Sequence, residues 1–489
     1  MGSFREFLDN LKGYNEINTV EEQIDWDLEA AAICTMSQRV GGPAVLFSNV
    51  KDYPNMLLTG AVFSGPGFYY WPQEKRLMHG RMAVALDLEP DTHYEEFVET
   101  ILDRGKAPIR AIEVESGSSQ QLVIDDVDLY SYPIPRLHEK DGGRYLTSHI
   151  MLHRDQENGW TNLNMEPLML YRRNMLVRTK PSRQTMPSQS EVIIEKYHRQ
   201  NKPAPFAIVI GAPPALTMTA RFNNPPGADE YGFAGGLGLK PLILVKAKLS
   251  DILVPADAEM ILEGHVYPGD MAEGGPFPSL SFYEEKKEGY VYRVECITQR
   301  RDAILPFSVE GVKSSDSMCL LSLMHSAQML NLLRTNGIPA KWMTMPVEAK
   351  LSLGVVALHS PQPVPGLPGR AAHLVFGKSP YIRQMIFVDN DVDPQDFTTS
   401  VLTDKIYKAS FQRNYFVSPQ AEKPLGLTEN HDFNSGLTST AFIDATWRLD
   451  RAPETIPRRI NFEVCFPEDV KNDLLRKWNK ELKLTPKAW

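Results

Sequence analysis

The chain has 489 residues, of which 42% are hydrophobic, and a net charge of -9 from 61 acidic and 52 basic side chains. A single hydrophobic core stops growing at roughly 250–300 residues, so this length predicts two or three domains. The charges are interspersed along the sequence rather than gathered in basic blocks, which argues against nucleic acid as a partner.

The first part of the chain predicts a small α/β domain, which we place at residues 1–120. Apolar residues at helical spacing predict helices over residues 4–11, 28–40 and 93–104. Apolar runs between them predict strands over residues 44–47, 56–61 and 78–86.

The next part predicts a β-rich, barrel-like domain over residues 121–312. Short apolar runs alternate there with Gly, Pro, Asn and Asp, as in small barrels. Residues 317–334 form the longest uninterrupted helical pattern, so we expect a helix that joins two domains within residues 313–335. Mixed strand and helix patterns then predict a C-terminal α/β domain over residues 336–489.

Residues 254–283 predict a strand that ends in a rigid turn facing a cavity. Proline removes a backbone donor and glycine allows positive φ, so Pro268, Gly269 and Pro276 oppose a helix or a regular ladder. Long irregular loops commonly carry binding or catalytic groups. The acidic candidates in this stretch are Glu259, Glu263, Asp270 and Glu273. The alternative interpretation is a surface hairpin with solvated carboxylates.

The cysteines predict a reduced intracellular protein, which we expect to be cytoplasmic. Cys34, Cys296, Cys319 and Cys465 are widely spaced and form no CxxC or Cys/His ligand pattern, which opposes structural zinc and a disulfide framework. The N-terminus has no basic leader followed by an apolar stretch, and no segment approaches the ~20 apolar residues of a membrane span.

Two motifs that suggest ligand binding are better explained by packing. The glycine-rich residues 232–238 lack the strand-then-helix context of a nucleotide-binding loop, so we expect a close-packed turn of the barrel. His149 and His153 lie on one face of an expected strand and predict two half-buried histidines rather than a metal pair.

A set of dispersed short motifs, in order along nearly the whole chain, resembles the UbiD-type decarboxylases, including the fungal ferulic acid decarboxylases. The resemblance implies an N-terminal α/β domain, a central split β-barrel of the flavin-reductase type, a linker helix and a C-terminal α/β dimerisation domain. It also implies prenylated FMN, a divalent metal such as Mn²⁺, and K⁺. The matching motifs are Pro133-Ile-Pro-Arg136, Trp160-Thr-Asn162, Ile210-Gly-Ala-Pro-Pro-Ala215, Leu253-Val-Pro-Ala256, Leu262-Glu-Gly264, Gly275-Pro-Phe277, Val388-Asp-Asn-Asp-Val-Asp393 and Asp473-Leu-Leu-Arg-Lys-Trp478.

The resemblance also implies a cofactor site with an altered metal ligand. The family holds its metal with Asn, His and Glu, and the corresponding positions here are Asn162, Gln189 and Glu230. An amide oxygen suits a hard divalent ion, although it binds a transition metal more weakly than an imidazole does. The implied cofactor contacts are Asn162, Asn164, Met165, Glu166, Ser188, Phe222 and Ser317.

The catalytic Glu-Arg-Glu set of the family is replaced in this chain. The arginine position falls on Pro167, and the two glutamates fall on Gly274 and Ser279. A proton donor of tuned pKa must then come from elsewhere. We therefore take Glu273 and Glu310, together with the replaced position Ser279, as catalytic candidates. Arg221 adds a new charge near the same expected pocket.

Three functional hypotheses follow from the resemblance and its departures. The first is a carboxy-lyase that decarboxylates an unsaturated or aromatic carboxylic acid in secondary metabolism, with a rebuilt active site. The second is a flavin-independent isomerase or cyclase on the same scaffold. The third is a catalytically inactive paralogue that acts as a binding partner. In each case we expect a homodimer and a small-molecule ligand, with neither nucleic acid nor membrane as a partner.

Overall fold

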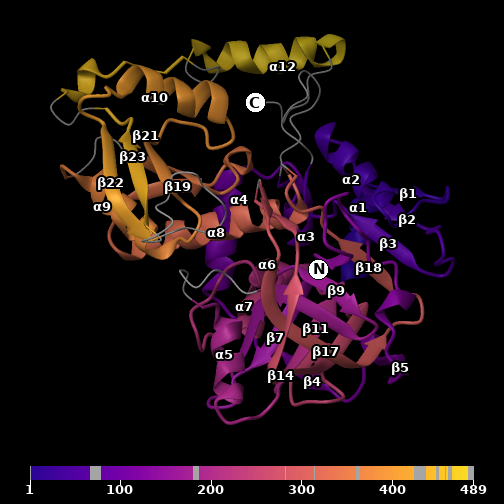
Figure 1. Ribbon diagram of the computed structural model, residues 1–489. Helices are drawn as coiled ribbons and strands as arrows, with labels where there is room; N and C mark the ends of the chain where they lie inside the picture. Colours follow the sequence, from indigo (N-terminus) through magenta and orange to yellow (C-terminus); the bar gives the residue numbers. More distant parts are fainter. Residues whose placement is uncertain are drawn as a thin grey trace.

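The chain contains a curled antiparallel sheet, with an α/β layer from each end of the sequence beside it (Figure 1). In Figure 1 the N-terminal strands lie at the upper right of this sheet and the C-terminal sheet at the upper left. The computed structural model describes residues 2–65, 79–179, 187–280, 282–312, 314–359, 364–422, 437–447, 451–457, 459–460 and 465–482.

The N-terminal layer is a four-stranded sheet covered by helices. The sheet order is β1-β2-β3-β18, and β18 (Ile304–Phe307) runs parallel to β3. This strand comes from residues expected in the central domain, so the first layer is completed by a distant segment. The other elements are α1 (Phe4–Gly13), β1 (Ile17–Val20), α2 (Glu29–Arg39), β2 (Ala44–Phe47), β3 (Leu57–Gly60), α3 (Gly80–Ala85) and α4 (Tyr94–Gly105).

The strand expected over residues 78–86 is wrong, because the described part of this run forms helix α3. Every residue of α3 is buried, and Arg81 donates to the carbonyls of Ala61 and Gly42 and to the carboxylate of Glu16. A short run that is apolar on all sides has no periodicity that separates a buried strand from a buried helix. Tertiary packing therefore determines that this run forms a helix and not a strand.

The central layer is a nine-stranded sheet in which every pairing is antiparallel. Its order is β6-β9-β10-β17-β14-β11-β7-β8, with β5 paired to β17. The sheet curls around the buried side chains of Phe206, Ile208 and Tyr292. Its strands are β5 (Leu122–Ile124), β6 (Tyr145–Leu146), β7 (His149–Arg154), β8 (Thr161–Asn164), β9 (Leu168–Arg172), β10 (Met175–Thr179), β11 (Ala204–Ile210), β14 (Met260–Gly274) and β17 (Lys287–Gln299).

Smaller elements surround this sheet. Strands β13-β12-β4 form a three-stranded sheet, and β15 and β16 form a hairpin. Their bounds, with those of the central helices, are β4 (Ile112–Val114), η1 (Ser118–Gln120), η2 (Leu129–Ser131), α5 (Gln189–His198), α6 (Pro214–Thr219), α7 (Glu230–Gly238), β12 (Ile243–Lys246), β13 (Leu253–Pro255), β15 (Phe277–Ser279) and β16 (Phe282–Glu284).

Two glycine-rich segments differ from expectation. The expected barrel turn at residues 232–238 is helix α7; a Cβ on Gly235 or Gly236 would lie 2.4 or 2.7 Å from backbone carbonyl oxygens of the chain that precedes β4. Glycine is used there for close packing rather than for a turn. Strand β14 also continues to Gly274 past the expected turn, and its pairing with β17 absorbs Pro268 and Gly269 in a register shift between Val266 and Met271.

Helix α8 (Asp316–Thr335) connects the central region to the C-terminal sheet. Ser315 caps its first turn by accepting a hydrogen bond from the Met318 amide. The Asp316 carboxylate accepts hydrogen bonds from the backbone amides of Val62, Phe63 and Ser64, which fix α8 against the N-terminal layer. The expected linker helix is confirmed.

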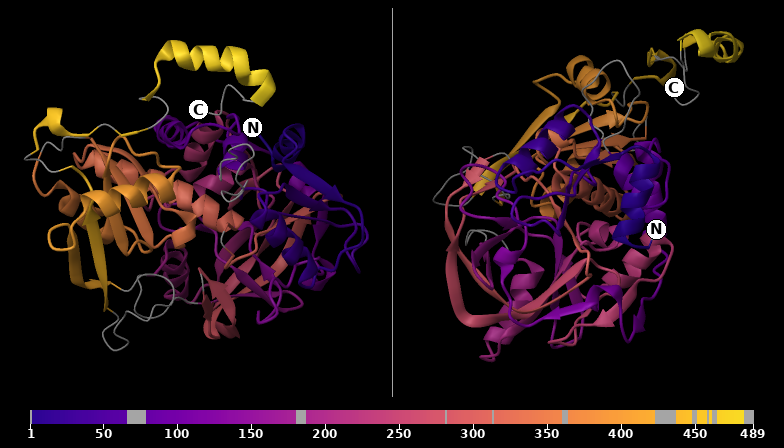
Figure 2. Two further views of the ribbon diagram at one scale, coloured as in Figure 1. Left: turned by 90° about the horizontal axis from the view of Figure 1, so that it is seen from above. Right: turned by 90° about the vertical axis from the view of Figure 1, so that its right-hand side faces the viewer.

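The C-terminal sheet has the order β19-β20-β21-β23-β22, in which β20, β21 and β23 are parallel. Helix α12 stands away from the rest of the molecule (Figure 2). The multi-domain α/β fold class is confirmed, while the numerical domain boundaries stay predictions. The elements are β19 (Ala340–Thr344), η3 (Val347–Ala349), β20 (Leu353–Leu358), α9 (Leu367–Lys378), β21 (Gln384–Asp389), the π-helix η4 (Phe397–Val401), α10 (Leu402–Lys408), β22 (Tyr415–Glu422), β23 (Leu437–Asp444), η5 (Pro453–Thr455) and α12 (Glu468–Leu482).

None of the described helices has the length and hydrophobicity that crossing a bilayer would require. All four cysteines are free thiols, and only Cys465 is exposed. The expectation that the cysteines form no disulfide framework therefore agrees with the structure.

Candidate active site

Three segments far apart in sequence bring Asn162, Gln189 and Glu230 into one hydrogen-bonded cluster. The Asn162 amide on β8 donates to Ser190 Oγ at 3.0 Å, one residue beyond Gln189. The backbone amide that follows Asn162 donates to Glu230 Oε1 at 3.2 Å. Gln189 Nε2 donates to the Asn224 carbonyl at 3.0 Å, and the Asn224 side chain interacts with Glu230. The cluster lies where helices α5 and α7 begin.

Glu230 is a buried carboxyl with no basic partner. Burial raises its pKa to about 8, and the Leu163 amide and the Asn224 side chain lower it only in part. No cation is among the groups of the described residues that act on it. One carboxylate and two amide side chains form a set of hard oxygen donors, which fits a divalent cation such as Mg²⁺ or Mn²⁺. A bound cation would supply the missing positive charge.

Beside this cluster lies an ionic network that the sequence did not reveal. Arg178 on β10 is only 2% exposed and pairs with Glu166, and its Nη1 lies 3.5 Å from Glu191. Its Nη2 donates to Ser188 Oγ at 3.1 Å, and Ser188 also caps α5. Glu166 and Ser188, both expected as cofactor contacts, are therefore engaged by Arg178. An arginine in a short apolar strand gave no signal of this role.

A second polar cluster gathers around Arg221, which follows helix α6. Arg221 Nη1 donates to the Met165 carbonyl at 3.0 Å, and Nη2 donates to Ser317 Oγ on α8 at 2.6 Å. Glu310 is half-buried after β18 and interacts with Arg221 and with the hydroxyls of Ser308 and Ser317. Burial raises the pKa of Glu310, and Arg221 and the two hydroxyls oppose that rise. The cluster joins a half-buried cation to an acid that can carry a proton.

The remaining cofactor candidates are placed between or beside these clusters. Both polar atoms of the Asn164 side chain are buried and have no hydrogen-bond partner among the described residues, so they can meet a ligand. Phe222 is instead part of the core and packs on Phe233 with ring centroids 4.7 Å apart. The Met165 carbonyl and the Ser317 hydroxyl each accept a hydrogen bond from Arg221.

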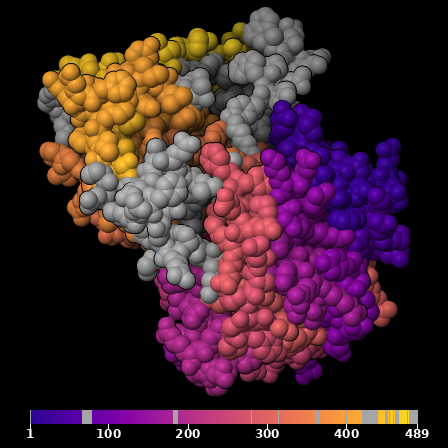
Figure 3. All heavy atoms as spheres, viewed as in Figure 1, coloured from indigo at the N-terminus to yellow at the C-terminus, as the bar shows by residue number. Residues whose placement is uncertain are grey.

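Glu273 does not point into a pocket, so its expected buried position is wrong. Its side chain is 64% exposed and its carboxylate lies 3.2 Å from Lys286 Nζ. The region of β14 and β17 runs along the surface of the molecule (Figure 3). At Gly274 a Cβ would lie 2.9 Å from the side chains of Val177 and Thr179, so there is no room for the family glutamate.

The other acids of this stretch are also structural. Glu259 is fully buried and bound by Arg5, and Glu263 is buried and accepts the Leu249 amide. Asp270 pairs with Arg293. The backbone of Ser279 pairs with Phe282 in the β15–β16 hairpin, and its side chain lies outside the described residues. The candidate acid therefore moves from Glu273 to Glu310.

His149 and His153 are fully buried, not half-buried as expected, and their surroundings differ. His153 Nε2 lies 3.2 Å from the Tyr292 hydroxyl, while neither ring nitrogen of His149 has a partner. Burial lowers the pKa of each to about 3. His149 lines a cavity of about 10 Å³, which has room for roughly one water molecule.

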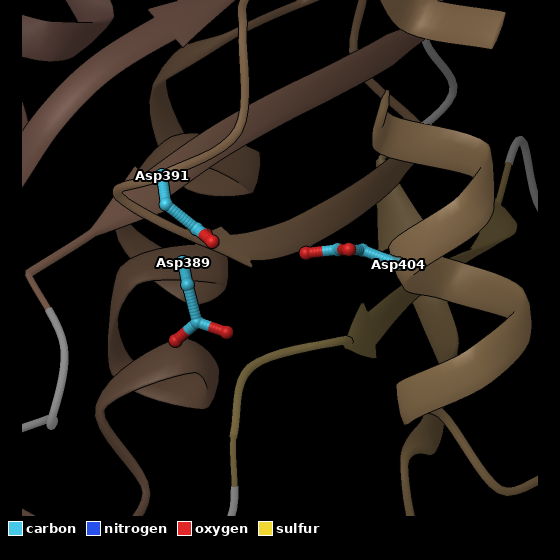
Figure 4. Close-up of side chains that lie close together, drawn as sticks. All are labelled: Asp389, Asp391 and Asp404. Carbon is cyan, nitrogen blue, oxygen red and sulfur yellow. The ribbon is translucent and has the colours of Figure 1, made fainter. Parts of the chain in front are cut away.

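Three carboxylates of the C-terminal region also lie close together: Asp389 at the end of β21, Asp391 just after it, and Asp404 on α10 (Figure 4). Lys408 Nζ lies 2.6 Å from Asp389 and 2.7 Å from Asp404. Arg459 donates to both Asp391 and Asp404. Two cations already compensate these acids, so the arrangement is an ion-pair network rather than a metal centre.

The comparisons with known proteins agree with this architecture. The chain is 29% identical over 496 residues to a pyrrole-2-carboxylic acid decarboxylase of Pseudomonas aeruginosa, covering 97% of both chains. It is 28% identical over 360 residues to a ferulic acid decarboxylase of Saccharomyces cerevisiae, covering 71% of this chain and 70% of that protein.

Solved structures share the fold. The open form of the vanillic acid decarboxylase of Sedimentibacter hydroxybenzoicus superposes with a TM-score of 0.82 at 23% identity, covering 99% of both chains. The UbiD-class enzyme HmfF of Pelotomaculum thermopropionicum, in complex with FMN, superposes with a TM-score of 0.81 at 23% identity, covering 94% of this chain and 98% of that one.

Two family models match most of the chain. The model of the 3-octaprenyl-4-hydroxybenzoate carboxy-lyase N-terminal domain matches residues 8–101, and that of the Rift-related domain matches residues 111–313. Together with the full-length relatives and the shared fold, these matches show that the chain belongs to the UbiD family of carboxy-lyases.

Proposed function

We propose that this protein decarboxylates an unsaturated or aromatic carboxylic acid through a rebuilt active site. The observation that carries the proposal is Glu310, a half-buried acid that shares its surroundings with the half-buried cation Arg221. The relatives support the reaction class, since their names describe decarboxylation of pyrrole-2-carboxylic, ferulic and vanillic acids.

Glu310 acts as the proton donor in this proposal. Departure of carbon dioxide leaves an electron pair on carbon, which must be delocalised and then protonated. A carboxyl group donates only while it is protonated, and burial raises the pKa of Glu310. The raised pKa widens the pH range in which Glu310 is protonated and can donate a proton. Neither solvated Glu273 nor Gly274 provides such a group.

We further propose a flavin, as FMN or prenylated FMN, with a divalent metal such as Mn²⁺ and with K⁺. HmfF has been solved with FMN and, in an evolved dimeric form, with prenylated FMN. A bound flavin would supply an electron sink for the pair left on carbon. Asn162, Gln189 and Glu230 would hold the metal, and the unpartnered amide of Asn164 would contact the cofactor.

Absorbance of the purified protein tests the cofactor proposal. We expect a visible flavin band that survives gel filtration, and bound metal by elemental analysis. Glu230→Gln removes the only charged ligand of the metal set and should weaken metal binding at least about 10-fold, with loss of the band. Glu273→Gln, which removes an exposed carboxylate, is the matched control and should keep both the bound metal and the flavin band.

The outcome also separates the three hypotheses. Carbon dioxide release from a panel of aromatic and unsaturated acids, with a flavin band, supports the decarboxylase. Turnover of an acid without flavin and without carbon dioxide release would instead favour an isomerase or cyclase. Protein that binds acids but converts none of them would favour an inactive binding partner.

We also propose a homodimer formed through the C-terminal sheet. Strand β22 is the edge of that sheet, and edge strands present unpaired backbone groups. Exposed apolar residues gather on the same sheet and its flanking helix: Ile406, Tyr407, Phe411, Phe416 and Val417. Tyr407 and Phe411 are 85% and 81% exposed, so they contribute little to the core of one subunit.

Light scattering after gel filtration tests the dimer. At micromolar concentration we expect about twice the chain mass of 55.2 kDa. The double variant Tyr407→Glu with Val417→Glu places charge on this surface and should produce monomer. Val192→Glu, on the exposed face of α5, should leave the mass unchanged. A monomeric native protein, or an unchanged mass in the double variant, would contradict the interface.

A further inference from the structure

Arg221 is a half-buried cation whose charge is not matched by an ion pair among the described residues. Two of its donors are used, on the Met165 carbonyl and the Ser317 hydroxyl, and neither of these acceptors carries a charge. Its Nε–H is itself buried and has no hydrogen-bond partner in the part of the chain that the structure describes. Glu310 acts on it electrostatically but forms no ion pair with it among the described residues. A buried charge without a counter-ion is costly, so such a site favours an anion.

Tyr381, from the C-terminal part of the chain, acts electrostatically on the same guanidinium. The Tyr381 side chain interacts electrostatically with Arg221 and packs edge-on against His325 of α8, with ring centroids 5.5 Å apart. His325 Nε2 and Ser379 Oγ are 2.9 Å apart, which ties the turn before β21 to α8. Tyr381 is therefore held in place by the linker helix rather than left on a loose loop.

Two segments meet at one guanidinium, since Arg221 follows α6 and Ser317 lies in the first turn of α8. A third residue, Tyr381, precedes β21 and acts on Arg221 electrostatically. We propose that Arg221 and Tyr381 form a carboxylate-binding site, with the Arg221 charge and its Nε–H facing the anion and the Tyr381 hydroxyl donating a further hydrogen bond. The inference rests on the proposed function for its ligand class, a carboxylic acid, but not on turnover.

This site compensates for a specific loss in the sequence. Pro167 stands where the family resemblance implies an arginine, and proline has neither charge nor donor. Arg221 supplies a cation from another segment, beside Met165 and within the field of Glu310. A carboxylate held there would have the proposed proton donor close to its own carbon skeleton, as decarboxylation requires.

Matched acid and amide pairs test the site by binding alone. The probes are benzoate with benzamide and cinnamate with cinnamamide, measured by titration calorimetry on the purified full-length protein. Native protein should bind at least one acid more tightly than its amide. Arg221→Met should weaken the acid about 10- to 100-fold, as expected for lost hydrogen bonds to a charged group, and leave the amide nearly unchanged. Tyr381→Phe should weaken the acid about 2- to 10-fold.

Further variants make the test specific. Arg221→Lys keeps the charge but loses the planar pair of donors of the guanidinium. Its affinity for the acid should therefore lie between those of the native protein and Arg221→Met. Arg173→Met removes an arginine that pairs with Asp126 at the surface and should bind both probes as the native protein does. The thermal midpoint of each variant reports whether it is folded. Glu310→Gln should keep acid binding, because Glu310 is not the required counter-ion.

The proposal is overturned if no acid of the panel binds the native protein more tightly than its amide. It is also overturned if folded Arg221→Met binds the acid with native affinity, or if Glu310→Gln alone abolishes acid binding. Acid binding that depends on Arg221, in a protein that releases no carbon dioxide, would support the site while contradicting the proposed decarboxylation. A failure of the carboxylate-binding site can therefore be distinguished from a failure of the proposed decarboxylation.

Discussion

Glu310→Gln is expected to lower kcat for decarboxylation by about 10²- to 10⁴-fold, the range that one positioned general acid contributes. The variant keeps the size and hydrogen-bonding capacity of the side chain but removes the transferable proton. Because Arg221 and Tyr381 bind the carboxylate in our proposal, KM should change little. Steady-state assays of carbon dioxide release measure both constants.

The pH dependence of turnover provides an independent check of the same residue. Burial raises the pKa of Glu310 above its ordinary value, so the carboxyl is protonated below that raised pKa and ionised above it. A required proton donor therefore produces a kcat that falls as pH increases through this pKa. Glu310→Asp should retain some activity and shift the falling limb, whereas Glu310→Gln should lose it.

Glu273→Gln is the matched control for Glu310. Glu273 is mostly exposed and paired with Lys286, so its replacement should change kcat by less than about 2-fold. Native kcat in Glu310→Gln, together with loss of turnover in Glu273→Gln, would reverse the assignment. Loss in both folded variants would show that the two acids act together.

Arg5→Met should lower the free energy of unfolding by roughly 3 kcal/mol, the lower end of the range for breaking a buried pair. Arg5 on α1 donates from Nε and Nη2 to the two carboxylate oxygens of Glu259, each at 2.9 Å. Glu259 is fully buried and also accepts the Ile304 amide. Without Arg5 its nearest remaining cation in the structure is Arg300, whose Nε lies 4.0 Å away. Urea denaturation followed by circular dichroism measures the change.

Lys51→Met is the control for this effect. Lys51 and Asp25 form a pair of similar length at 2.6 Å, but the Lys51 side chain is 52% exposed, so Lys51→Met should shift the urea midpoint much less than Arg5→Met does. Equal midpoints for Arg5→Met and native protein would show that α1 does not stabilise the strands around β18 through Glu259.

Much of the fold could be predicted from patterns of apolar residues. Helices α1, α2 and α4 and the long helix α8 coincide closely with the amphipathic or apolar stretches of the sequence. Helices α3 and α7 could not be predicted in this way. The first is apolar on every side, and the second is rich in glycine because neighbouring carbonyls approach its backbone closely.

The candidate site was predictable in part. The resemblance indicated Asn162, Gln189 and Glu230, which the structure brings together although they come from three separate segments. It also indicated that Pro167 and Gly274 could not perform the roles of the family residues. Nothing in the local sequence distinguished Glu273 from Glu310. Each precedes a glycine, and such a local pattern does not indicate how far the carboxylate is exposed to water.

The sequence by itself determined the family, and it predicted the order of the domains and the loss of the family's catalytic side chains, since each of these follows from residue identity and spacing. Only the tertiary structure decided which charged groups are solvated and which are not. Glu273 lies against Lys286 at the surface, Arg178 pairs with Glu166, and half-buried Arg221 interacts electrostatically with Glu310 and Tyr381. The physical reason is that the cost of a charge depends on water and on partners brought from distant segments, which no local pattern contains.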